Sequence, residues 1–159
     1  MGEVDSIELA SLRPAAQAAS SAGLRARRRL SSPPVSDQET RAKLDRHWST
    51  AGDRDQGAAH EIYHEDCVVE WPQSGERVRG RANLRALRTA YPARLEFSVR
   101  RILGGGDLWI TEYSISYDGQ PVHVVSIMEF RDGLVARETH YFADPFEAPE
   151  WRARWVEPM

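Results

Sequence analysis

Residues 108–142 read LWITEYSISYDGQPVHVVSIMEFRDGLVARETHYF and contain two Asp-Gly pairs, at 118–119 and 132–133. Both pairs lie between runs rich in Val, Ile, Tyr, Phe and Thr, the residues that favour β-strands. Asp-Gly is the strongest short-range signal for a two-residue hairpin turn, because both turn positions need a positive φ. The pattern therefore predicts an antiparallel meander with strands at 108–117, 122–131 and 134–142.

Outward from this stretch, the β pattern continues toward the N-terminus for one more long strand. A strand is predicted at 94–103, before the loop Gly104-Gly105-Gly106-Asp107. A shorter strand is predicted at 67–71, because these residues read CVVEW, with adjacent β-branched valines, and Pro72 follows them.

Ahead of the strands the hydrophobic spacing changes to the helical period. Ser36 and Glu39 form the pattern of a capping box, and Leu44, Trp48 and Ala51 follow at helical spacing. These features predict a helix at 37–50, and weaker patterns predict helices at 55–64 and 82–90. Helices followed by strands place the chain in the α+β class.

The two ends of the chain differ from the segment between them. Residues 1–36 are rich in Ala and Ser and have no aromatic residue, so we expect a disordered N-terminal arm. The domain is expected at 37–146. The tail at 147–159 carries Trp151 and Trp155, which are expected to anchor it against the domain.

Composition excludes several classes of protein. The 159 residues carry 21 basic and 24 acidic side chains and a single cysteine, Cys67, which favours one cytoplasmic domain without a disulfide. The formal charge of −3 gives no basic footprint for nucleic acid, and no apolar run is long enough to cross a membrane. Lys43 is the one lysine and lies in a polar helical stretch, so Schiff-base chemistry is not expected.

Four strings in this order resemble the nuclear transport factor 2-like (NTF2-like) superfamily, and within it the SnoaL-like branch. They are WSTAGD at 48–53, YHEDCVVEWP at 63–72, VRGRANLR at 78–85 and YFADPF at 141–146. The resemblance covers about 37–146. It implies a cone-shaped barrel, in which a strongly curved, mostly antiparallel sheet and three N-terminal helices enclose a cavity, and it implies a homodimer. Members include polyketide cyclases and ketosteroid isomerases, but fold does not imply activity.

The catalytic groups of ketosteroid isomerase are not kept in this sequence. Alignment by eye places its general-base Asp on Trp71, its oxyanion-hole Tyr on Asp45 and its protonated Asp on Ile127. Steroid isomerisation by that mechanism is therefore not expected here.

The same alignment, extended by strand alternation, predicts which side chains point into the cavity. His140 with Glu129 or Glu138 is the candidate catalytic pair, because a carboxylate beside a buried imidazole orients it for general acid/base catalysis. Tyr113 and Thr111 are candidates to hold a substrate oxygen. Further candidate substrate contacts are Trp48, Trp71, Trp109, His123 and Phe142. A register or parity one residue different would instead turn these polar groups to water.

Three other residue patterns have simpler interpretations. The string His60-Glu61-Ile62-Tyr63-His64 matches the H-E-x-x-H zinc motif, but on a short helix with no further ligand we interpret it as a chance match. Asp45 and His47 are expected to be solvated, and Cys67 to be a buried small apolar residue.

These observations predict a cofactor-free acid/base enzyme, of the isomerase, cyclase, hydratase or dehydratase type, acting on a small apolar or aromatic molecule. No metal, nucleic acid or membrane partner is expected. The alternative is a non-catalytic module of the same fold that binds a ligand or a partner protein.

Overall fold

The structure is a computed structural model that describes residues 35–52, 57–92 and 95–159. All but the last two residues of the predicted arm at 1–36 lie outside these ranges. Helix α1 (Asp37–Thr50) begins at the predicted capping box. Ser36 Oγ accepts a hydrogen bond from the Glu39 backbone N–H, and the Glu39 carboxylate accepts one from the Ser36 N–H at 2.9 Å. Leu44 and Trp48 are buried on its inner side, as their spacing predicts.

The second predicted helix, at 55–64, is largely wrong. Helix α2 (Gly57–His60) has four residues, and strand β1 (Tyr63–Trp71) begins three residues after it ends. Tyr63 is paired with Val135 of another strand, and the Val135 N–H donates to the Ile62 carbonyl at 2.8 Å. Pairing with a distant strand thus overrides the local helical preference.

Six strands form one sheet in the order β2-β1-β6-β5-β4-β3. Strands β3 (Leu95–Gly105), β4 (Leu108–Tyr117), β5 (Gln120–Arg131) and β6 (Leu134–Ala143) form the predicted antiparallel meander. Strand β1 joins β6 in parallel and pairs with the short β2 (Glu76–Arg79) in antiparallel fashion. Helix α3 (Arg81–Ala90) follows β2, and the α+β class is confirmed.

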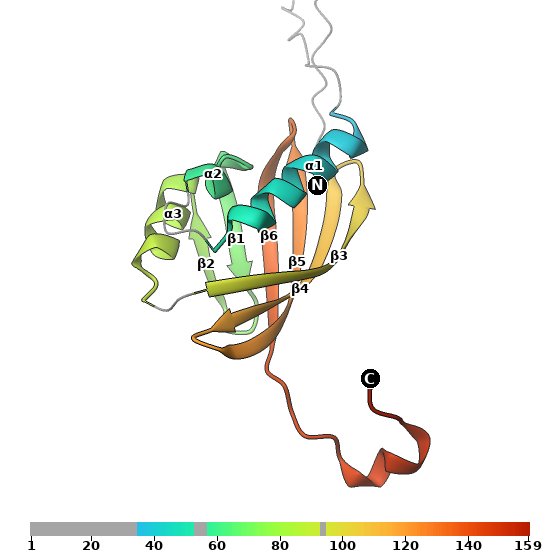
Figure 1. Cartoon of the computed structure of the whole chain (residues 1–159). Helices are drawn as coiled ribbons and strands as arrows, with labels where there is room; N and C mark the ends of the chain where they lie inside the picture. Colours follow the sequence, from blue (N-terminus) through green and yellow to red (C-terminus); the bar gives the residue numbers. More distant parts are fainter. Residues whose placement is uncertain (1–34, 53–56, 93–94) are drawn as a thin grey trace, which may run out of the picture. The chain divides into compact units, whose positions relative to one another are not determined.

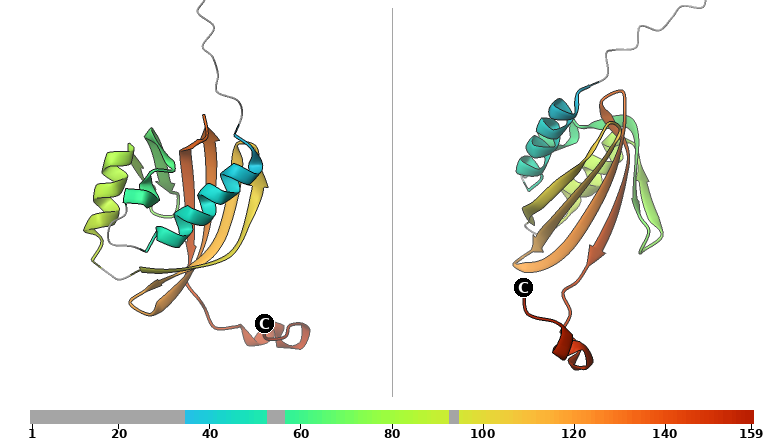
Figure 2. Two further views of the ribbon diagram at one scale, coloured as in Figure 1. Left: turned by 45° about the horizontal axis from the view of Figure 1, so that its top comes forward. Right: turned by 90° about the vertical axis from the view of Figure 1, so that its right-hand side faces the viewer.

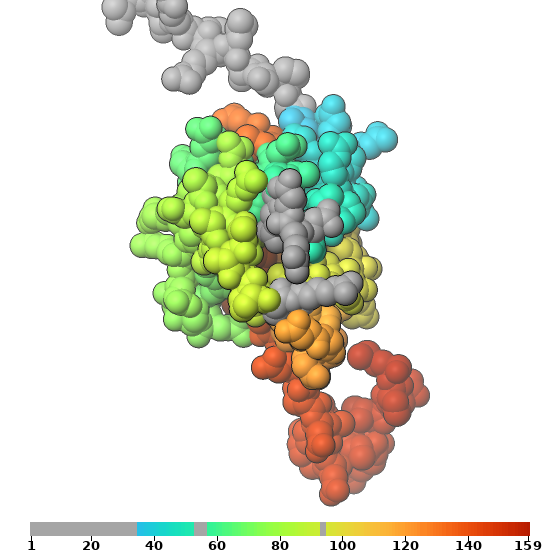
Figure 3. Space-filling model, turned by 60° about the vertical axis from the view of Figure 1, so that its left-hand side comes forward, coloured from blue at the N-terminus to red at the C-terminus, as the bar shows by residue number. Residues whose placement is uncertain are grey.

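The helices lie over one face of the sheet, called here the inner face. Helix α1 crosses this face diagonally in Figures 1 and 2, while α3 lies near β1 and β2. Helix α3 and the β1–β2 hairpin make up much of the side that faces the viewer in Figure 3. The core between these layers includes Leu44, Val69, Leu84, Val124 and Met128.

The two Asp-Gly turns have the backbone that the sequence predicts. The φ angles are 50° and 90° at Asp118 and Gly119, and 53° and 75° at Asp132 and Gly133. Positive φ at both positions defines the type I′ region, so the strands on either side pair directly.

The predicted inward face of β5 is wrong. The inner side of β4 carries Trp109, Thr111 and Tyr113 as predicted, and also Ile115. These four residues pair with Met128, Ser126, Val124 and Val122 of β5. Directly paired residues point to the same face. His123 and Glu129, which were expected inside, therefore point to the outer face, together with Val125 and Ile127.

A β-bulge between β5 and β6 explains why β6 was nevertheless predicted correctly. Phe130 pairs with Val135 but Glu129 pairs with Arg137, so Ala136 is an extra residue on β6. Beyond the bulge, Ser126 pairs with His140 and Met128 with Glu138. Glu138 and His140 consequently point inward, whereas an unbulged hairpin would have paired them with the outward residues of β5.

The C-terminal tail contains one short 3-10 helix, η1 (Glu150–Trp155). Trp151 and Trp155 are exposed in the structure. Their anchoring against the domain stays a prediction. Across the described part of the chain, no helix is long and apolar enough to span a membrane.

Candidate functional site

A buried carboxylate, Glu138, is at the centre of the polar groups on the inner face. Its Oε1 atom accepts hydrogen bonds from Ser126 Oγ at 2.6 Å and from His140 Nε2 at 2.9 Å. Its Oε2 atom accepts from Tyr63 Oη at 2.6 Å and from Arg88 Nη2 at 3.4 Å. The side chain has no exposed area, so the hydrogen bonds that each oxygen makes to water in the unfolded chain are replaced by hydrogen bonds from two protein donors.

Four elements of the fold supply these donors. Glu138 and His140 lie two residues apart on β6 and therefore share its inner face, and Ser126 is the β5 partner of His140. Tyr63 begins β1, the parallel neighbour of β6. Arg88 lies four residues after the buried Leu84 on α3, which directs both toward the sheet.

Glu138 is ionised in this setting. Burial alone would raise its pKa, but the contact with His140 and the charge of Arg88 outweigh burial and lower the pKa well below its ordinary value. Burial raises the pKa of Tyr63, so its hydroxyl remains a proton donor. Arg88 is charged as well, and the Arg88–Glu138 pair is neutral overall.

His140 is held at one ring nitrogen and not at the other. Nε2 contacts the Glu138 carboxylate, so Nε2 carries the proton of the neutral ring and Nδ1 carries the lone pair. Nδ1 is buried and has no hydrogen-bond partner among the residues that the structure describes. The rings of Trp71 and Phe142 lie beside the imidazole, with centroids 6.4 and 5.7 Å away. The ring of His140 is thus oriented, and its basic Nδ1 atom is buried without a partner in the described part of the chain.

A cavity of about 680 Å3 lies between the helices and the inner face. His140 and Arg88 are two of its eight polar lining residues, and the other 13 are aliphatic or aromatic. The aromatic side chains that line it are Trp48, Trp71, Tyr91, Phe97, Tyr113, Tyr117 and Phe142. This composition, a mostly apolar wall with a minority of polar groups, is that of a small-molecule site.

Five of the predicted site residues meet at this cavity: His140, Trp48, Trp71, Tyr113 and Phe142. Glu138 lies directly behind His140. Burial raises the pKa of Tyr113, so its hydroxyl keeps its proton at neutral pH.

Two further predicted contacts are buried but engaged elsewhere. The Thr111 hydroxyl accepts a hydrogen bond from Trp48 Nε1 at 3.0 Å, and Trp109 Nε1 donates to the Gly106 carbonyl. Neither side chain is among those that line the cavity.

The structure does not bring Glu129 or His123 to the site. Both lie on the outer face of β5, for the reason of register given above, and the Glu129 side chain is 55% exposed. Of the two carboxylates predicted as partners of His140, only Glu138 contacts it.

Sequence reasoning did not find Tyr63, Arg88 or Ser126. The position of Ser126 can be predicted from the sequence, because a two-residue turn at 118–119 pairs it with Thr111 and so places it on the inner face. Tyr63 was assigned to a helix, and Arg88 has no local feature that separates it from the other arginines of α3.

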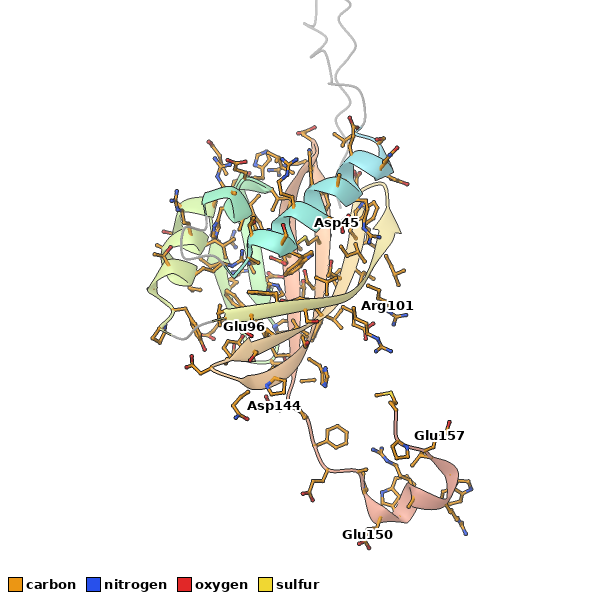
Figure 4. All side chains as sticks on the ribbon, in the orientation of Figure 1. Asp45, Glu96, Arg101, Asp144, Glu150 and Glu157 are labelled. Carbon is orange, nitrogen blue, oxygen red and sulfur yellow. The ribbon has the colours of Figure 1, made fainter. Side chains whose placement is uncertain are left out.

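The expected solvation of Asp45 and His47 holds for one of them. The Asp45 side chain is exposed on α1 (Figure 4), whereas His47 is buried and donates from Nδ1 to the Ala59 carbonyl at 2.8 Å. Burial, with Arg88 nearby, lowers the pKa of His47 to about 4. His47 lines the cavity as a neutral ring. Cys67 is a buried free thiol, as predicted.

We expect His47 to make stability depend on pH. Between pH 6.5, the ordinary pKa of histidine, and pH 4, the unfolded chain binds a proton at residue 47 that the folded chain does not. Stability therefore falls with falling pH, by up to about 3 kcal/mol from this group. Urea unfolding from pH 7 to pH 4 measures it. His47→Asn, whose amide can still donate to Ala59, should lose less stability over this range; equal losses in both proteins would contradict the assignment.

The H-E-x-x-H string does not have the helical geometry of the zinc motif in this fold. Because α2 ends at His60 and β1 begins at Tyr63, the two histidines are not one turn apart on a helix. His64 pairs with Asp66, with Nδ1 and Oδ1 2.5 Å apart. The described ranges contain no group of three or more His, Cys, Asp or Glu that could hold a metal ion.

Comparison with known families agrees with this geometry. The sequence pattern of the SnoaL-like domain matches residues 44–138, which is more than half of the chain. The chain belongs to the SnoaL-like domain family. A search of curated proteins found no match.

Solved structures similar to this SnoaL-like chain share its NTF2-like fold. An NTF2-like protein of unknown function from Burkholderia xenovorans is 54% identical, with a TM-score of 0.72 over 77% of this chain and 96% of that chain. A protein from Kribbella flavida, named a "putative ketosteroid isomerase", is 28% identical, with a TM-score of 0.71 over 79% and 93%. An epoxide hydrolase from M. tuberculosis is 20% identical with a TM-score of 0.56 over 66% and 83%, a likeness of fold alone.

Proposed function

We propose that this protein binds a small apolar or aromatic organic molecule in its cavity and moves a proton on that molecule with His140, without a cofactor. One observation carries the proposal. The His140 ring lines an aromatic-walled cavity, its Nε2 atom is held by an ionised carboxylate, and its Nδ1 atom has no partner in the described part of the chain. This is the arrangement of an oriented general base.

Each polar group has a separate role in the proposal. His140 Nδ1 takes the proton, and Glu138 stabilises the imidazolium that forms. Arg88, Tyr63 and Ser126 are positioning residues, because they hold the Glu138 carboxylate. Tyr113 donates its hydroxyl proton to an oxygen of the substrate, while Thr111 is left out of this role because it does not line the cavity.

The reaction class follows from a base that removes and returns a proton in an apolar cavity. Isomerisation, cyclisation, hydration and dehydration all have this requirement. The name of the Kribbella flavida relative suggests an isomerase. A protein of this fold from Catenulispora acidiphila, 13% identical, has been crystallised with trimethylamine, which supports small-ligand binding by the fold.

A probe of proton abstraction tests the proposal without knowledge of the substrate. When a base removes the ring C–H proton of 5-nitrobenzisoxazole, the N–O bond breaks and a coloured cyanonitrophenolate with a nitrile group forms. We expect saturable turnover by the full chain, above that of a mixture of free imidazole and acetate. Turnover no faster than this mixture would overturn the catalytic proposal.

A non-catalytic ligand-binding module is the second candidate, favoured by the indoles of Trp48 and Trp71 in the cavity wall. It predicts a saturable change in tryptophan fluorescence with the same probe and no turnover. The two functions therefore differ in the appearance of product at saturating probe.

The remaining expectations belong to the same proposal. We propose a homodimer formed through the outer face of the sheet, where five large apolar side chains are exposed: Leu103, Leu108, Ile110, Val125 and Tyr141. A cone-shaped barrel that encloses the cavity and a cytoplasmic location also stay predictions.

A further inference from the structure

The protons around Glu138 and His140 restrict what the cavity can hold. The Glu138 carboxylate already accepts from four donors, and one of them is the Nε2–H group of His140. The neutral ring therefore carries a lone pair on the buried Nδ1 atom. None of the described residues donates to this atom. A buried acceptor without a donor is unfavourable, so an occupant that supplies a donor gains affinity at this atom.

The neighbours of His140 indicate which kind of donor is suitable. Trp71 lies nearly parallel to the imidazole, at an interplanar angle of 20°, and the Phe142 ring is tilted at 49° to it. Flat apolar walls favour a ring-shaped occupant. The charged residues that line the cavity are Glu76, Arg77, Arg88 and Asp144, and of these Arg88 shares the Glu138 carboxylate with His140. The Arg88 side chain is 21% exposed while Glu138 is fully buried, so an ammonium donor beside His140 would meet the positive charge first, whereas an oxygen acid would not meet a like charge.

We infer that the occupant is a ring-bearing weak acid, a phenol or an aromatic carboxylic acid, whose O–H proton lies against Nδ1 of His140. This inference rests on the proposed function, because it assigns the ligand class of the same cavity.

The proton balance of binding follows from this assignment. The neutral acid forms O–H···Nδ1, and if the proton transfers, the O–H bond breaks, an Nδ1–H bond forms and the oxyanion faces an imidazolium held by Glu138. Both forms of the complex contain the same protons. At a pH where the free acid is ionised, binding must therefore take up one proton from solvent.

The probe for this inference is 4-nitrophenol, with 4-nitroanisole as its methyl ether without the acidic proton. We expect the wild-type protein to bind the phenol at least about tenfold more tightly than the ether below the pKa of the phenol. Above that pKa, the apparent Kd of the phenol should rise about tenfold per pH unit, while that of the ether stays constant. The yellow band of the nitrophenolate reports whether the bound proton is on the oxygen or on the ring nitrogen.

His140→Phe keeps an aromatic ring beside Trp71 and removes the acceptor, so the preference for the phenol over the ether should disappear. If this variant does not fold, the pH titration of the wild-type protein decides alone. Equal affinities of phenol and ether, or a phenol affinity that does not change with pH, would overturn the inference.

The outcome is separable from that of the proposed function. Preference for the phenol without turnover of 5-nitrobenzisoxazole would support the ligand class and reject catalysis. Turnover of 5-nitrobenzisoxazole without a preference for the phenol would support catalysis and reject the ligand class.

Discussion

His140→Gln is expected to lower kcat/KM for 5-nitrobenzisoxazole by a factor of about 10²–10⁴, the usual contribution of a positioned general base. Glutamine can keep a donor toward Glu138, but its amide has no basic nitrogen. The cavity and the Glu138 hydrogen bonds should therefore persist while proton abstraction is lost. Initial rates of product formation over a range of probe concentrations measure the effect.

The matched control is His123→Gln. His123 is an exposed histidine on the outer face of β5, on the strand next to the one that carries His140. The same substitution there should leave kcat/KM unchanged. If both variants retain the wild-type rate, another group removes the proton, and the assignment of His140 is wrong.

Glu138→Leu should be the most destabilising single substitution among those considered for this site. Leucine removes the acceptor for Ser126, Tyr63, His140 and Arg88 at once, and it leaves the guanidinium without its carboxylate. Loss of one partner of a buried ion pair costs about 3–5 kcal/mol. Urea unfolding at pH 7 measures the change in the free energy of unfolding.

Glu129→Leu is the control, because Glu129 is the other carboxylate considered for His140 and its nearest ion-pair contact, with Arg137, is 4.0 Å long. An exposed site of this kind changes stability by no more than about 0.5 kcal/mol. Glu138→Gln should fall between the two, since it keeps one acceptor oxygen and loses the charge. A stability of Glu138→Leu equal to that of Glu129→Leu would mean that the carboxylate does not hold the cluster together.

The candidate site was predicted in part. His140 and Glu138 were found because alternation along one strand is a local property, and two residues apart they share a face whatever the rest of the sheet does. Glu129 was wrongly grouped with them because it lies on β5 and they lie on β6. The face that two strands share depends on how they pair, and the bulge at Ala136 shifts the pairing of β5 with β6 by one residue. Arg88 and Tyr63 could not be found, since they reach Glu138 from α3 and β1 across the interior.

The features that the sequence by itself determined are those with a local cause. The Asp-Gly turns need only the backbone freedom of two adjacent residues, and the capping box needs only hydrogen bonds between residues three apart. The tertiary structure decided the end of α2 and the set of donors around Glu138. These depend on residues tens of positions apart, whose distance is set by sheet pairing and burial and leaves no periodic trace in the sequence.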